Sequence, residues 1–183
     1  LTFRRQDRLV TLPDIESFAN SHISSYGSVG KATAATRRAY SSANIIDIYV
    51  LEKANELQLR RATPAFKSSL LAAMNEKKML TDEFVVVDGL IRTMDLVVTI
   101  SLDREFKPQE ELIKLTVRNK ILDHFKVDNR SFGQRFIPQD LNREIFNIPE
   151  VRFSSIDNIS NIIQLDFNEI IQLNNFSINV EYV

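Results

Sequence analysis

The chain has 183 residues, with 23 Lys or Arg against 24 Asp or Glu, so its net charge at neutral pH is −1. This balance favours neither nucleic acid nor an anionic membrane as a partner, because both attract strongly cationic surfaces. The sequence has no Cys and two His, which excludes disulfides, thiolate catalysis and cysteine-based metal sites. Hydrophobic residues make up 44% of the chain, enough to bury a core, and the length corresponds to roughly one domain of about 150 residues.

The sequence begins at Leu1 rather than Met, and we expect a piece of a longer chain. No apolar run approaches the roughly 18 residues that a membrane-spanning helix needs. The densest apolar patches, over 84–87 and 96–98, have the length of strands. We therefore expect a soluble protein with no membrane partner.

Four helices are predicted to begin near a proline, where the missing N–H costs nothing. The first follows Thr11, a good N-cap residue, and Asp14 stands three residues later. Its apolar stripe consists of Leu12, Ile15, Phe18, Ala19 and Ile23. The other helices are predicted from Pro64, from Pro108 to about Phe125, and from Pro138 to about Asn147.

Alternating apolar and polar residues predict strands over 94–102 and 176–182, and less cleanly over 46–50. Val151 and Phe153 indicate a further short strand. Asp88-Gly89 is typical of a tight hairpin turn between 84–87 and 94–102. The predicted class is therefore α+β, with antiparallel or mixed strands packed against three longer helices and one short helix. We expect a helix and strands in residues 1–50 and an α+β region in residues 51–183, or one continuous domain.

No cluster of residues indicates catalysis. The stretch 27–33 resembles the end of a phosphate loop, but the first glycine is replaced by Ser25 and Lys31 is followed by Ala32, so we interpret it as a turn. His22 and His124 are each predicted near the negative end of a helix. We therefore predict no catalytic, cofactor-binding or metal-binding residue, no small-molecule ligand and no enzymatic activity.

Phenylalanine supplies 12 of the aromatic residues, and two of them, Phe132 and Phe136, fall in a turn-like stretch. Such residues pack back on their own domain or onto a partner. The terminal strand is a second candidate contact, because an uncovered strand edge pairs readily with a neighbour. The predicted subunit interface therefore consists of Phe132, Phe136, Phe176, Ile178, Val180 and Tyr182.

Several segments, taken in order, resemble the C-terminal half of the baseplate J-like proteins. The segment 8–16 resembles the family's Arg-x-Val-Thr-x-x-Asp-Tyr-Glu helix start, with Ile15 in place of Tyr. The segment 26–32 resembles the family's aromatic-Pro-Gly-Val turn, with Gly27-Ser28 in place of Pro-Gly. The segment 46–50 is similar to the strand that follows, and 168–173 is similar to the Glu-Ile-x-x-Leu segment before the last strand.

The resemblance implies a structural protein of the virion. Members of this family build the wedges of contractile-tail baseplates, pair as homodimers and join other wedge subunits in a ring around the tail hub. It also implies a location in the tail baseplate after assembly in the host cytoplasm, and a relationship to the larger wedge subunit of T-even-type phages. The alternatives are a soluble adaptor domain, an enzyme that uses Asp and Glu, and a nucleic-acid-binding module.

Overall fold

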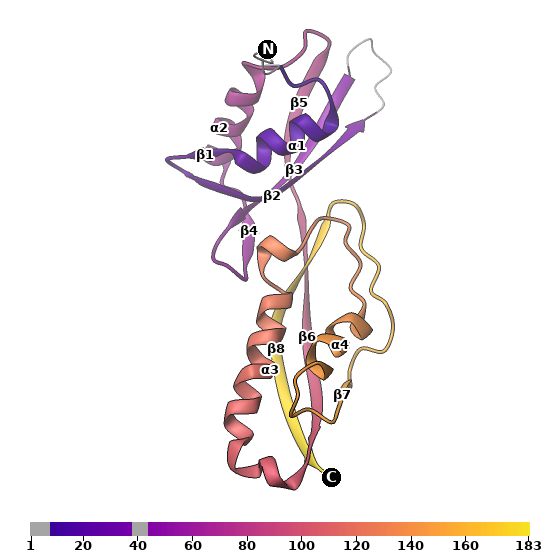
Figure 1. Cartoon of the computed structure of the whole chain (residues 1–183). Helices are drawn as coiled ribbons and strands as arrows, with labels where there is room; N and C mark the ends of the chain where they lie inside the picture. Colours follow the sequence, from indigo (N-terminus) through magenta and orange to yellow (C-terminus); the bar gives the residue numbers. More distant parts are fainter. Residues whose placement is uncertain (1–7, 38–43) are drawn as a thin grey trace, which may run out of the picture. The chain divides into compact units, whose positions relative to one another are not determined.

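The computed structural model describes residues 8–37 and 44–183, and these form four α-helices and eight strands in two sheets. The predicted α+β class is confirmed. The described residues divide into two compact units (Figure 1). The N-terminal unit contains the described part of 1–55 together with 59–90, and the C-terminal unit contains 56–58 and 91–183. The predicted boundary at residue 50 is wrong, because position 50 lies inside a strand that pairs on both of its sides.

The N-terminal unit is a five-stranded sheet with two helices packed against it. Its strands are β1 (Ile23–Ser24), β2 (Gly27–Arg37), β3 (Asn44–Lys53), β4 (Leu59–Arg61) and β5 (Asp82–Asp88), and its helices are α1 (Leu12–Ser21) and α2 (Pro64–Asn75). The central strand β3 runs antiparallel to β2 and β4 and parallel to β5. The hairpin predicted at Asp88-Gly89 is therefore wrong, because β5 pairs with β3 and the next strand joins the other sheet.

Helix α1 begins as predicted, with a capping box between Thr11 and Asp14. It buries Ile15 and Ala19 against the sheet, where they meet Phe66 and other residues of α2. The helix ends at Ser21, so Ile23 lies in β1 with 79% of its surface exposed. The prediction that Ile23 extends the apolar stripe is therefore wrong.

The stretch 27–33 lies in β2 rather than in a phosphate-binding loop or a turn. The register between β2 and β3 shifts at Gly30. A Cβ atom at Gly30 would lie 2.4 Å from Leu59 Cδ2 and 2.9 Å from the backbone nitrogen of Lys53. This glycine is therefore required for the close approach of neighbouring strands.

The C-terminal unit is built on a three-stranded sheet in the order β7-β6-β8. Its elements are β6 (Leu90–Leu102), the 3₁₀-helix η1 (Arg104–Gln109), α3 (Glu110–His124), the 3₁₀-helix η2 (Val127–Asn129), α4 (Pro138–Phe146), β7 (Phe153–Ile156) and β8 (Glu169–Tyr182). Pro108 falls inside η1, so α3 begins two residues later than predicted. Val151 lies before β7, outside the short strand predicted around it.

Strand β7 runs antiparallel to β6. Strand β8 runs in the same direction as β6, because the Asn175 N–H donates to Asp95 Oδ1 (3.0 Å) and the Val183 N–H donates to the Leu102 carbonyl (3.0 Å). The sheet of this unit is therefore mixed.

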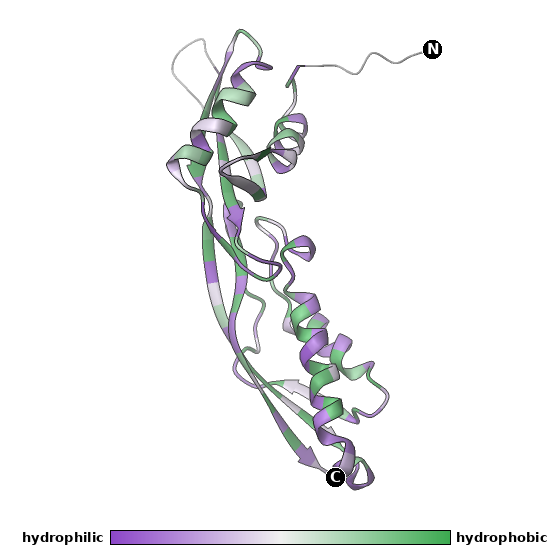
Figure 2. Cartoon of the chain, turned by 90° about the vertical axis from the view of Figure 1, so that its left-hand side faces the viewer, coloured by the Kyte–Doolittle hydropathy of each residue, from purple (hydrophilic) through white to green (hydrophobic). Residues whose placement is uncertain are grey.

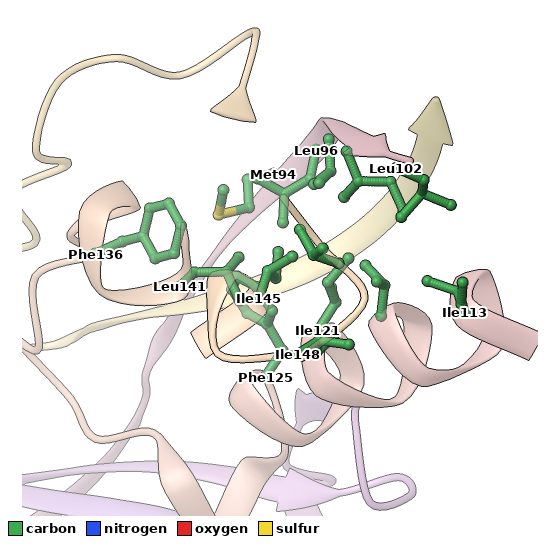
Figure 3. Packing of buried hydrophobic residues seen from close by; sticks show 14 of the residues in the cluster. Met94, Leu96, Leu102, Ile113, Ile121, Phe125, Phe136, Leu141, Ile145 and Ile148 are labelled. Carbon is green, nitrogen blue, oxygen red and sulfur yellow. The ribbon is translucent and has the colours of Figure 1, made fainter. Parts of the chain in front are cut away.

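The predicted alternation along β6 places every second side chain in the core of the C-terminal unit. These side chains are Met94, Leu96, Val98, Ile100 and Leu102, and they face Ile113, Val117 and Ile121 of α3 and Leu141 and Ile145 of α4 (Figure 3). The sheet and the two helices thus share one continuous apolar core.

Candidate functional site

The two predicted interface residues of the loop before α4 have different surroundings. Phe136 is completely buried, with its ring centroid 5.6 Å from that of Phe125, and its backbone forms a bridge with Ile163. Phe132 is half-buried. Phe136 therefore belongs to the core of its own unit, and the prediction that it faces a partner is wrong for this fold.

The four predicted interface residues of β8 turn their side chains toward the core. Phe176, Ile178, Val180 and Tyr182 are half-buried and pack against the apolar cluster of the C-terminal unit. The residues between them are exposed, and Figure 2 shows this alternation of hydrophobic and hydrophilic residues near the C-terminus. What β8 offers to a neighbour is therefore mainly its backbone edge and its polar face, while Phe176 and Ile178 also line a groove beside α3.

Strand β8 ends the sheet, and its outer side pairs with no strand among the described residues. Proteins usually protect such an edge with Lys, Pro, a bulge or a covering segment. The segment 174–182 contains neither Lys nor Pro, and Glu181 is its single charged residue. This edge is therefore open to pairing with another strand.

A groove runs beside this edge, between β8 and α3. Its volume is about 590 Å³. It is lined by Glu111, Lys114, Leu115, Arg118, Phe176 and Ile178. Leu115 is 52% exposed, and Leu112, one helical turn earlier on α3, is 64% exposed. We call the outer side of 174–182 together with this groove and Leu112 the β8 edge surface.

Charged side chains of α3 fix the rim of this surface. The Arg118 guanidinium lies 5.4 Å from the ring centroid of Phe176 and makes a cation–π contact with that ring. The Tyr182 hydroxyl donates a hydrogen bond to Glu110, and Lys114 Nζ lies 2.6 Å from the other carboxylate oxygen of Glu110. The hydrogen bond from Lys114 holds the pKa of Glu110 below its usual value, and the bond to Glu110 raises the pKa of Tyr182. These contacts anchor the end of β8 on α3.

The sequence identified β8 but missed the contribution of α3. Leu112 and Leu115 lie outside the buried stripe of α3, which consists of Ile113, Val117 and Ile121. Two leucines outside the core-facing stripe of a helix indicate a contact with a partner, and the sequence alone contains this pattern.

The two histidines have ordinary partners. His22 Nε2 lies 3.3 Å from Ser69 Oγ, and His124 Nδ1 lies 3.0 Å from Glu144 Oε1. Within 8–37 and 44–183, no group of three His, Cys, Asp or Glu side chains is placed to hold a metal ion. No helix in that part of the chain is both long enough and apolar enough to cross a bilayer.

No protein-family model and no curated protein matches this chain.

Proposed function

We propose that this chain is a structural subunit of a contractile-tail baseplate wedge, and that it acts by pairing with a second copy of itself and by joining other wedge subunits. The observation that carries the proposal is the unpaired edge of β8 beside the exposed Leu112 and Leu115. The kind of assembly, and its place in the tail of a virion, rest on the resemblance of the sequence to the baseplate J-like proteins.

Pairing of two β8 edges suits a homodimer. An open edge exposes a row of N–H and C=O groups, and antiparallel pairing with an identical edge satisfies both rows in one two-fold symmetric contact. When the pairing is centred near Ile178, Glu181 lies opposite the partner's position 175 rather than opposite its own copy. Like charges therefore do not oppose each other across the pair. Burial of Leu112 and Leu115 adds a gain of about 25 cal/mol for each Å² of apolar surface removed from water.

Sedimentation equilibrium of the purified chain tests this pairing. We expect a concentration-dependent dimer. The double variant Ser177→Lys with Asn179→Lys places two charges on exposed positions of β8, and we expect it to weaken the dimer at least about tenfold, which corresponds to about 1.4 kcal/mol.

A second double variant, Leu112→Gln with Leu115→Gln, removes the exposed apolar surface of α3 while keeping good helix formers. We expect a similar weakening. Phe146→Gln is the matched control, because Phe146 is an exposed apolar residue of α4 that does not line the groove. A chain that stays monomeric, or a dimer that neither double variant weakens, contradicts pairing through the β8 edge surface.

The assignment to a baseplate has its own test. Antibodies against this chain are expected to label the baseplate end of purified contractile tails. Tails that carry no label, under conditions in which the antibodies detect the purified chain, contradict the assignment even where the chain dimerises.

A further inference from the structure

Arg130 is an arginine buried in the C-terminal unit. Only 4% of its surface is exposed, although it lies in the loop that follows η2. Its guanidinium carbon lies 5.2 Å from the ring centroid of Phe125 and 5.9 Å from that of Phe136. The two rings attract the cation through their faces but accept no conventional hydrogen bond from it.

The guanidinium of Arg130 lacks the partner that such a buried group requires. Its Nε and Nη2 atoms are sealed from solvent and have no hydrogen-bond acceptor in the described part of the chain. By contrast, the Nε and Nη2 atoms of Arg37, an arginine whose side chain is largely exposed, donate to the two carboxylate oxygens of Asp47 at 2.9 and 2.6 Å. A buried charge without a partner is costly, and burial accordingly lowers the pKa of Arg130. Arginine nevertheless stays protonated at neutral pH.

Arg130 forms part of the wall of a pocket of about 340 Å³. The other lining residues are Lys120, Asp123, His124, Asn129, Gln134 and Glu144. Lys120, Asn129 and Gln134 are exposed, so the space is a pocket open to solvent. Because a water molecule takes about 30 Å³ of liquid, it has room for a small ion together with several waters.

Two cations of this wall, Lys120 and Arg130, have no direct acidic partner, because the two acidic residues of the wall contact other groups. Asp123 Oδ1 is held by Lys126 Nζ at 2.7 Å, and Glu144 Oε1 is held by His124 Nδ1 at 3.0 Å. No ion pair within the described ranges includes Lys120 or Arg130. An anion that enters the pocket therefore meets Lys120 and Arg130 without having to displace a carboxylate from either.

We propose that this pocket binds a small oxyanion, a phosphate or a carboxylate, through Arg130 and Lys120. The positive charge of a guanidinium is delocalised over its three nitrogens, so an oxyanion against the pocket wall is attracted by the whole group even where two nitrogens are sealed. Asn129 and Gln134 supply neutral amides at the same wall. The site is independent of the β8 edge surface and goes beyond the proposed structural function.

Thermal unfolding in titrations of sodium phosphate and of sodium acetate tests the proposal, with sodium chloride holding the ionic strength constant. We expect a saturable rise of Tm with at least one of the two salts, because an ion that binds only the folded state stabilises it. If Tm rises with phosphate alone, the pocket selects a tetrahedral oxyanion. If Tm rises with acetate as well, the pocket also accepts carboxylates, either free or on an acidic side chain.

Three variants locate the binding. Arg130→Met keeps the stacking of a long side chain on Phe125 and Phe136 but removes the charge, so we expect it to abolish the saturable rise of Tm. Lys120→Gln is expected to lower the affinity for the anion by about tenfold or more, because a hydrogen bond between charged groups is lost. Lys78→Gln is the matched control, since it makes the same charge change at an exposed residue of the N-terminal unit.

The starting stability of Arg130→Met separates binding from a structural role. Replacing a buried unpaired charge by an apolar side chain leaves stability equal or higher, so we expect its Tm without added anion to match or exceed that of the parent chain. The proposal is overturned if neither salt produces a saturable rise of Tm. It is also overturned if the Arg130→Met variant keeps the saturable rise that the parent chain shows. If Arg130→Met does not fold, equal anion affinity of the Lys120→Gln and Lys78→Gln variants overturns it.

Discussion

Phe132 and Phe136 belong to one loop, four residues apart, yet only Phe136 is completely buried. The sequence left two alternatives for both rings, packing on their own domain or contact with a partner. The deciding contacts of Phe136 come from Phe125 at the end of α3 and from Ile163 of a distant loop. Neither contact is local in sequence, so composition alone could not separate the two residues.

Substitution of Phe136 therefore tests the core. Phe136→Ala is expected to lower the free energy of unfolding by about 3–5 kcal/mol, because it leaves a cavity where a completely buried ring stood. Phe153→Ala makes the same change on β7 at a ring that is 60% exposed, and we expect it to cost less than about 1 kcal/mol. Urea unfolding of both variants measures the difference. Equal costs for the two variants would place Phe136 at the surface.

Arg130 illustrates a residue that the sequence could not identify. It lies in a polar, turn-like stretch, where an arginine is normally solvated. Its burial results from the aromatic rings of Phe125 and Phe136, one of which precedes Arg130 in the sequence while the other follows it. A basic residue among several phenylalanines is the only local signal, and that signal does not distinguish stacking from solvation.

At the scale of the elements, the starts of α1 and α2 were predictable because their causes are local. Thr11 and Thr63 are both N-caps whose side chains accept from a backbone N–H three residues later. Strand pairing was not predictable in the same way. Asp88-Gly89 matches a hairpin turn, but such a turn needs a positive φ, and the positive-φ glycines in the described chain are Gly27 and Gly133. Helix α2 instead connects β4 to β5 and lets β5 pair in parallel with β3.

The two N-caps differ in their acidic neighbours, which predicts different pH dependence. Thr11→Ala and Thr63→Ala are each expected to lower the free energy of unfolding by about 1 kcal/mol at neutral pH. Hydrogen bonds from the Thr11 side chain and backbone lower the pKa of Asp14 below 3.8, whereas α2 has no acidic residue in its first turn. A carboxyl group whose pKa is lower in the folded state than in the unfolded state stabilises the fold at pH values above the unfolded-state pKa. This stabilisation is lost as the pH falls through the folded-state pKa.

The cost of Thr11→Ala is therefore expected to shrink as the pH falls below 3.8, while the cost of Thr63→Ala stays constant. Denaturant unfolding of the two variants and the parent chain across this range measures both costs. A carbon-detected NMR titration adds a direct control, since the pKa of Asp14 should rise toward 3.8 in Thr11→Ala. A pKa of Asp14 that does not change in this variant would contradict the capping box.

At the scale of the whole chain, the two units have cores that share no buried residue. The sequence predicted the α+β class, the burial of Ile15 and Ala19 in α1, and the alternating buried residues of β3 and β6, because alternation and helical spacing report burial directly. It did not predict the boundary near residue 90. Apolar residues continue through 84–87, 90–91 and 96–98, so no change of composition marks the point where the chain leaves one sheet and enters the other.

Separate cores predict separate local stability. Leu70→Ala in α2 and Leu141→Ala in α4 remove the same atoms from completely buried sites, one in each unit, at an expected cost of about 2–5 kcal/mol each. Because the lost contacts lie within one core, we expect hydrogen exchange to accelerate in the peptides of the substituted unit and to keep its parent rate in the other. Hydrogen exchange followed by mass spectrometry measures both units in one sample, so each variant is the other's control. If hydrogen exchange accelerates in both units of either variant, the chain unfolds as one continuous domain, because a substitution in one core would then expose the amides of both units to exchange.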